Sequence, residues 1–143
     1  MKKNGMKKLM LGAVLVLSTG MFFIGCKSSN DSDNNPSGSI DPVVGTFKGT
    51  IEDGENPDIK YYNAFIIVSK VDDSRVKVTP KSGEAYSGYT AKTIKVTNPV
   101  GASVVGLDEQ GSVSYLIDTK SLNVGTEKNS AQDKIYIFNG SKQ

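Results

Sequence analysis

Few residues of this 143-residue chain could carry out catalysis. The sequence has no histidine, which is the commonest general base and a frequent zinc ligand, and it has a single cysteine. Acidic pairs occur at Glu52-Asp53, Asp72-Asp73 and Asp108-Glu109, but each pair lies in a predicted turn, where acidic side chains are common. We therefore predict that the protein is not an enzyme and that it needs no cofactor.

One short segment could bind a metal ion. Asp53, Glu55 and Asp58 place three carboxylates within residues 53–58, and carboxylate oxygens at this density can coordinate calcium. The segment lacks the length and the ligand order of the twelve-residue calcium loop. These residues are therefore a weak metal candidate, and a polar loop between two strands is the simpler interpretation.

The tyrosines are the better candidates for binding. Tyr61 and Tyr62 open a long apolar segment, and Tyr86 and Tyr89 lie in a stretch of Tyr, Ser and Gly at residues 82–90. This composition is typical of adaptable binding loops, because tyrosine offers a large contact area at a small cost in rotamer entropy. We predict that these four tyrosines contact a ligand or partner. In the alternative interpretation they only pack over the end of the folded domain.

The elements that position these residues are predicted to be strands. Short β-branched runs alternate with Gly, Asn, Asp and Ser clusters, and no long helical periodicity follows Cys26. The predicted strands are residues 46–52, 60–71, 75–79, 92–97, 102–107, 112–118, 121–124 and 134–139. We expect an all-β domain over residues 43–139 with a tail at 140–143. Short links favour an antiparallel meander that forms a closed or partly open barrel, and a two-sheet β-sandwich is the alternative.

The start of this domain resembles a known family. Residues 43–50 read Val-Val-Gly-Thr-Phe-Lys-Gly-Thr, and they resemble the first strand of the calycin-like, lipocalin-related β-barrels. Lipocalins carry Gly-x-Trp here, whereas this chain has Gly45-Thr46-Phe47 and no tryptophan. The predicted hairpin at residues 66–78 also resembles that group. The resemblance implies a barrel whose floor is filled by the aromatic ring of Phe47.

The only cysteine, Cys26, ends a segment with the parts of an export signal. Four lysines precede an uncharged apolar run at residues 9–24, and Gly25 stands directly before Cys26. Phe23-Ile24-Gly25-Cys26 resembles the lipobox of bacterial lipoproteins, with Phe where that family usually has Leu. The resemblance implies a cleaved signal peptide (residues 1–25), cleavage between Gly25 and Cys26, and fatty acid, such as palmitate, on Cys26. It implies a lipid anchor in the bacterial cell envelope, and we expect the outer membrane. An uncleaved membrane anchor is the alternative.

Cleavage would change the charge of the protein. Four of the 17 basic residues and none of the 15 acidic residues precede Cys26, so the mature chain has a net charge of −2. This balance does not favour a nucleic-acid partner, which requires concentrated positive charge. Residues 26–42 are predicted to be a polar tether that would span about 20 Å as a flexible chain. Alternatively, Asp31 and Asp33 resemble the acidic signal that directs some lipoproteins to the cell surface.

These observations predict a lipid-anchored binding module of the cell envelope. Its ligand would be a small apolar molecule, a glycan or a protein. The alternative is a structural or interaction subunit of an envelope complex, with a filled barrel and no small ligand. An apolar interior cavity of about 300 Å³ or more would favour a ligand carrier, whereas a filled interior would favour recognition at the surface.

Overall fold

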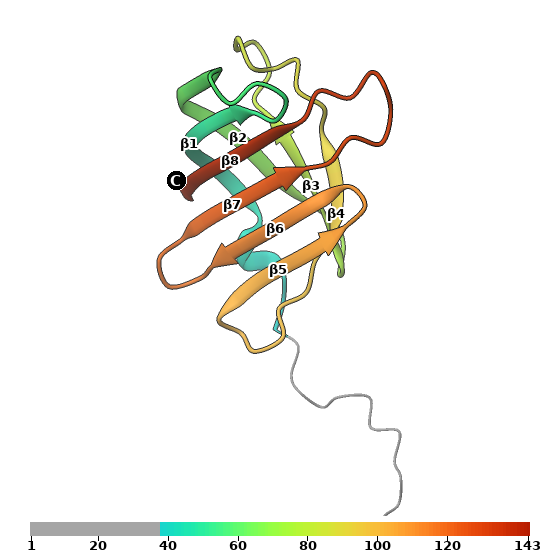
Figure 1. The fold of residues 1–143 in the computed structure, drawn as a ribbon. Coiled ribbons are helices and arrows are strands. Elements are labelled where there is room, and N and C mark those ends of the chain that lie inside the picture. Colours follow the sequence, from blue (N-terminus) through green and yellow to red (C-terminus); the bar gives the residue numbers. More distant parts are fainter. Residues whose placement is uncertain (1–37) are drawn as a thin grey trace, which may run out of the picture. The chain divides into compact units, whose positions relative to one another are not determined.

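Eight strands follow one another in the computed structural model, which describes residues 38–143 (Figure 1). A short 3₁₀ turn, η1 (Asp41–Val43), precedes them. The strands are β1 (Gly45–Asp53), β2 (Lys60–Asp72), β3 (Arg75–Pro80), β4 (Lys92–Lys95), β5 (Ser103–Asp108), β6 (Gly111–Leu116), β7 (Ser121–Thr126) and β8 (Tyr136–Lys142). Each predicted strand therefore has a counterpart, and the all-β prediction is confirmed. No helix among residues 38–143 is long and apolar enough to span a membrane.

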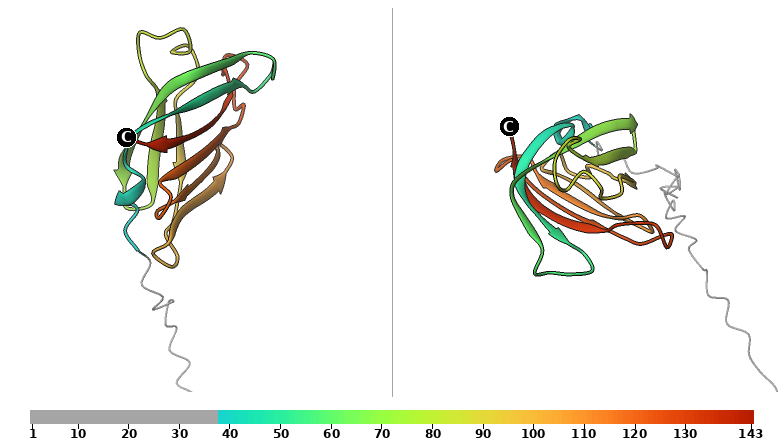
Figure 2. Two further views of the ribbon diagram at one scale, coloured as in Figure 1. Left: turned by 90° about the vertical axis from the view of Figure 1, so that its left-hand side faces the viewer. Right: turned by 90° about the horizontal axis from the view of Figure 1, so that it is seen from above.

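The strands form one antiparallel sheet in the order β4-β3-β2-β1-β8-β7-β6-β5. This order is an up-and-down meander in which β1 also pairs with β8, so the two ends of the domain meet. The sheet curves round on itself in the right-hand view of Figure 2. The fold is therefore a nearly closed barrel, which is compatible with a calycin-like fold, and not the alternative two-sheet sandwich.

One seam of the barrel, between β4 and β5, is only partly sealed. Thr97 and Val105 form an isolated bridge, with N···O distances of 2.8 and 2.9 Å. Near it, the backbone N–H of Lys95 donates a 2.7 Å hydrogen bond to the carboxylate of Asp108. The strands come this close because residue 106 is glycine: a Cβ there would lie 2.0 Å from the carbonyl oxygen of Lys95.

Large side chains fill the interior of the barrel. Alternate residues of each strand point inward, as expected for a sheet with one buried face. Phe47, Tyr136 and Phe138 are fully buried. The ring of Phe47 packs edge-on against Tyr115 with a centroid distance of 5.6 Å. Phe47 is thus a buried interior aromatic residue, as the resemblance to the calycin-like barrels implies.

The domain extends beyond its predicted limits at both ends. Gly140–Lys142 belong to β8 and pair with β1, so the predicted tail at 140–143 is wrong. Ile40 is buried in the core, and the N–H of Gly38 bonds to the carbonyl oxygen of Asn98, so the predicted tether ends before residue 38. Polar composition hid both extensions. The predicted signal peptide, Gly25, Cys26 and the rest of the tether lie outside the described residues.

Candidate functional site

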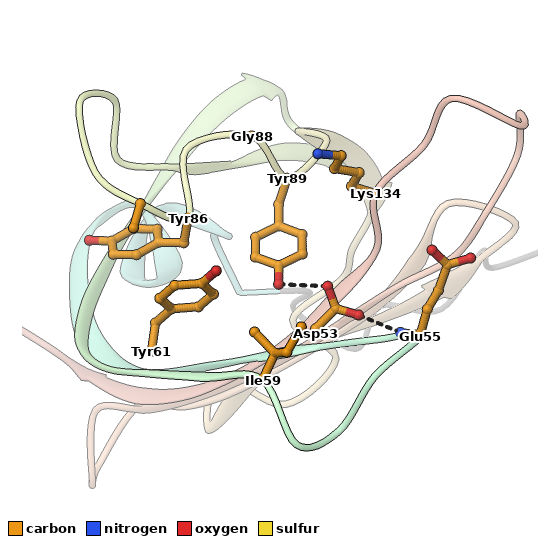
Figure 3. Close-up of a pocket in the computed structure, with 9 residues that line it drawn as sticks. Asp53, Glu55, Ile59, Tyr61, Tyr86, Gly88, Tyr89 and Lys134 are labelled. Atoms are coloured by element: carbon orange, nitrogen blue, oxygen red, sulfur yellow. Dashed lines mark hydrogen bonds between the residues drawn. The ribbon is translucent and has the colours of Figure 1, made fainter.

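A pocket of about 200 Å³ opens at one end of the barrel (Figure 3). It lies where β1 ends, where β2 begins and where the loops at residues 81–91 and 127–135 come together. Tyr61, Tyr86 and Tyr89 provide its aromatic side chains. Its other lining residues are Asp53, Glu55, Ile59, Ala85, Gly88 and Lys134.

A β-bulge decides which tyrosine of β2 reaches this pocket. Gly49 pairs with Ala64 and Ile51 pairs with Tyr61, so one residue of β1 faces two residues of β2, Tyr62 and Asn63. Asn63 has a φ of 56°, in the left-handed region that asparagine tolerates better than most residues. Without the extra residue, Ile51 would pair with Tyr62. The bulge therefore turns Tyr61 inward and leaves Tyr62 outside, with 72% of its surface exposed.

The pocket tyrosines form one packed cluster. The ring centroids of Tyr61 lie 5.7 Å from Tyr86 and 6.2 Å from Tyr89, with the rings strongly inclined. The hydroxyl oxygen of Tyr86 accepts a 2.8 Å hydrogen bond from the N–H of Phe65, which fixes the loop to β2. The ring of Tyr89 also packs on Tyr136, at 5.6 Å. Tyr86 and Tyr89 are only 6% and 9% exposed and belong to the hydrophobic core, against which the partly buried Tyr61 packs, so only small parts of these rings line the pocket.

Asp53 ties the loop at residues 81–91 to the end of β1. Its Oδ2 accepts a 2.8 Å hydrogen bond from the hydroxyl of Tyr89, and its Oδ1 accepts one from the N–H of Glu55 (Figure 3). The same Oδ1 also accepts a bond from the N–H of Asn56. Burial alone would raise the pKa of Asp53, but the hydrogen bonds and the nearby charge of Lys134 hold that pKa below its usual value. Burial, followed by the bond to Asp53, raises the pKa of Tyr89, so its hydroxyl stays protonated and donates.

A buried ion pair lies next to Lys134, one of the residues that line the pocket. The ammonium of Lys92, only 3% exposed, lies 2.7 Å from Asp133 Oδ2 and 2.6 Å from Asn129 Oδ1. The bond from Lys92 keeps the pKa of Asp133 far below its usual range. Next to this pair, Thr90 and Lys134 exchange two hydrogen bonds, which join the two rim loops. The sequence gives no signal for this network, because its members lie about 40 residues apart.

Two of the three carboxylates proposed as a weak metal candidate with Asp58, those of Asp53 and Glu55, serve other roles. Asp53 is occupied by three hydrogen-bond donors, and Glu55 forms an ion pair with Lys128. Within residues 38–143, no three acidic side chains converge in the way that a metal ion requires. The structure therefore uses this segment as a polar loop that braces the pocket.

Three of the four predicted binding tyrosines thus meet at one site, and Tyr62 does not. The structure also adds Tyr136, a fully buried neighbour of Tyr89 whose hydroxyl has no hydrogen-bond partner among the described residues. The sequence could not reveal the contact between Tyr136 and Tyr89, because Tyr136 stands in an ordinary strand pattern. Comparisons of the chain with protein-family models, with curated proteins and with solved structures found no match.

Proposed function

We propose that this protein is a lipid-anchored binding module of the bacterial cell envelope and that its ligand binds in the tyrosine pocket. The observation that carries the proposal is the clustering of Tyr61, Tyr86 and Tyr89 beside Asp53 at the end of the barrel. Tyr86 and Tyr89 are mostly buried and Tyr61 is partly buried, so the cluster is held rigidly and presents only ring edges beside polar groups, an arrangement that pre-formed binding sites use. The hydroxyl of Tyr89 meets the carboxylate of Asp53, but the pKa of Tyr89 is raised, so the hydroxyl stays protonated and is not activated as a nucleophile.

The pocket dimensions favour a small ligand or the end of a larger one. About 200 Å³ is less than the usual range for drug-sized ligands, which begins near 300 Å³. The filled interior of the barrel favours recognition at this end over capture inside. Aromatic faces next to a carboxylate and an ammonium group suit a single sugar ring, which has apolar faces and a hydroxylated edge. A terminal residue of a glycan is therefore the ligand that we propose.

The contact between rings argues against a cationic ligand in an aromatic cage. A cation in such a cage lies over several ring faces within about 6 Å of their centroids. Here the rings of Tyr61 and Tyr86 already pack against each other at 5.7 Å, which leaves no space between them for an ammonium group.

The anchor part of the proposal depends on the lipobox-like sequence that ends at Cys26. The described chain begins at Gly38, whose N–H bonds to Asn98 shortly before β1 begins, whereas the pocket lies where β1 ends. A tether that continues from Gly38 would therefore leave the pocket unobstructed.

Titration of the mature protein with oligosaccharides from its own cell envelope tests the ligand. The chain has no tryptophan and six tyrosines, so intrinsic tyrosine fluorescence reports binding. We expect Tyr61→Ala to weaken binding by roughly tenfold to a hundredfold, since stacking on one aromatic residue contributes about 1–3 kcal/mol. Tyr62→Ala is the matched control on the outside of the same strand. Equal effects of the two substitutions, or no binding by the native protein, would exclude the pocket as the glycan site.

The second candidate is an interaction subunit with no small ligand. It is favoured by the filled interior and by exposed apolar side chains that do not line the pocket, such as Leu107, which is 83% exposed. Native mass spectrometry of the protein from its own envelope separates the two proposals. A retained saccharide supports the binding module, whereas a stable protein complex without one supports the subunit.

A further inference from the structure

The outer surface of the barrel is divided into a basic half and an uncharged half. On β5 to β8 the outward side chains lack charge: Ser103, Val105, Leu107, Ser112, Ser114, Leu116, Ser121, Asn123, Ile137, Asn139 and Ser141. On β1 to β3, which lie side by side (Figure 1), the outward charges are mainly positive: the cations are Lys48, Lys60, Arg75 and Lys77, and the carboxylate of Glu52 is paired with Lys60. Since the mature chain is net acidic, this division is not a general property of its surface.

The centre of the basic half is an aromatic ring between two lysines. Lys48 on β1 is the cross-strand partner of Phe65 on β2, and Lys81 follows β3 on the other side. Their ammonium groups lie 5.7 and 5.0 Å from the ring centroid of Phe65. Ile67, two residues after Phe65 on the same face of β2, is 42% exposed. We refer to Lys48, Phe65, Ile67, Lys77 and Lys81 as the basic aromatic face.

The cations of this face are largely uncompensated. Among the ion pairs of the described residues, neither Lys48 nor Lys77 has a partner, and Lys81 has only a 3.3 Å contact with the half-exposed Glu84. Exposed apolar side chains surrounded by lysines are typical of surfaces that bind at a membrane interface, where the apolar groups enter and the cations meet anionic headgroups.

We propose that the basic aromatic face rests on an anionic lipid headgroup layer. Charge complementarity supports this occupant, and so does the length of chain between Gly38 and Cys26, which as a flexible chain would span about 20 Å and hold the barrel close to the membrane. The choice of a lipid layer rests on the proposed anchor at Cys26. At so short a distance the effective concentration reaches the millimolar range, so a weak contact is enough to orient the barrel. The pocket, at the end of the barrel, stays accessible in this orientation.

Lysine labelling tests the contact on the anchored protein. The mature protein from its host envelope is reconstituted in phosphatidylcholine vesicles with or without phosphatidylglycerol, and exposed lysines are acetylated and quantified by mass spectrometry. We expect Lys48, Lys77 and Lys81 to be labelled several-fold more slowly only with phosphatidylglycerol, and the difference to disappear at high salt. Lys120 and Lys128, outside the face, should be labelled equally in both vesicles.

A matched pair of triple variants sharpens the test. Lys48→Gln with Lys77→Gln and Lys81→Gln should weaken the contact roughly a hundredfold, since each lysine near an anionic surface contributes roughly fivefold. Lys95→Gln with Lys120→Gln and Lys128→Gln removes the same charge outside β1 to β3 and should leave the contact unchanged. Orientation is read for both from the acetylation rate of Lys60, which lies on β2 in the basic half.

Three outcomes would overturn the proposal. One is equal labelling in both vesicles, and another is an equal effect of the two triple variants. The third is protection by dextran sulfate in the absence of anionic lipid, which would assign the face to an acidic polysaccharide. The mass of the peptide that begins at Cys26 reports the anchor separately, so a missing fatty acid would refute the anchor without deciding what the face binds.

Discussion

The hydroxyl of Tyr89 donates a 2.8 Å hydrogen bond to Oδ2 of Asp53 across 36 residues of sequence. This bond joins the loop at residues 81–91 to the last residue of β1. The same carboxylate also accepts hydrogen bonds from the N–H groups of Glu55 and Asn56, in the turn between β1 and β2. A single carboxylate therefore fixes two walls of the pocket. Its state of ionisation and its partner should influence both stability and binding.

Tyr89→Phe removes this bond and keeps the ring. Hydrogen bonds to charged groups contribute about 1.5–3 kcal/mol, and partial exposure of Asp53 places the expected loss of unfolding free energy near the lower limit, about 1.5 kcal/mol. Urea denaturation measures it. Tyr62→Phe is the control, since Tyr62 is 72% exposed and its substitution should change stability by less than about 0.5 kcal/mol. An equal loss in both variants would mean that the bond contributes nothing.

Acid should destabilise the barrel through Asp53 and Asp133. The folded state lowers the pKa of both carboxylates, so each stabilises the fold above its unfolded pKa of about 3.8. That stabilisation is lost progressively as the pH falls below about 4 towards the folded values. The midpoint of urea unfolding should therefore be nearly constant from pH 7 to 5 and fall steeply below pH 4. In Asp133→Asn the fall should be shallower, and an unchanged profile would show that Asp133 is not responsible.

The bulge should require a residue at position 63 that tolerates the left-handed backbone conformation of Asn63. A β-branched residue in the left-handed region costs about 1–2 kcal/mol, so Asn63→Val should destabilise the barrel by this amount, while Asn63→Gly should be tolerated. Thermal or urea unfolding measures both. Deletion of Asn63 is the stronger test, because it would pair Ile51 with Tyr62 and bring Tyr62 to the inner face. If Tyr61 stayed protected from nitration in the deletion variant, the bulge would not control its direction.

This bulge also marks the limit of what the sequence could predict. The alternation of β-branched and polar residues was sufficient for all eight strands and for the meander, because period-two patterning follows directly from one buried face. The same alternation could not show that Tyr61 points inward and Tyr62 points outward. That direction depends on the extra residue of β2 in the bulge, and the bulge is visible only in the pairing of β2 with β1. Lys92 was similarly hidden, because a lysine in a predicted strand is normally exposed and here its burial depends on the distant Asp133.

Cys26→Ala tests the anchor on which the proposed function depends. If Cys26 is the acylated first residue of the mature protein, the variant should keep its signal segment, carry no fatty acid and migrate as the longer precursor. Mass spectrometry of the N-terminal peptide gives the answer directly. Ser28→Ala, two residues later, is the control and should be processed normally. Cleavage of Cys26→Ala before residue 26, with the variant still bound to the membrane, would disprove the lipobox interpretation.

The seam between β4 and β5 should depend on Gly106. A Cβ at this position would lie 2.0 Å from the carbonyl oxygen of Lys95, so Gly106→Ala must push the strands apart and weaken the bridge between Thr97 and Val105. Overpacking of this kind costs about 1–3 kcal/mol. In Gly106→Ala, the amides of Thr97 and Val105 should exchange hydrogen faster than in the native protein, while amides in the other strands should exchange at their native rates. Gly88→Ala is the control, because its Cβ would meet nothing closer than Lys134 Nζ at 3.9 Å. Unchanged exchange in Gly106→Ala would mean that the seam tolerates a wider gap and that close approach at Gly106 is not what closes the barrel.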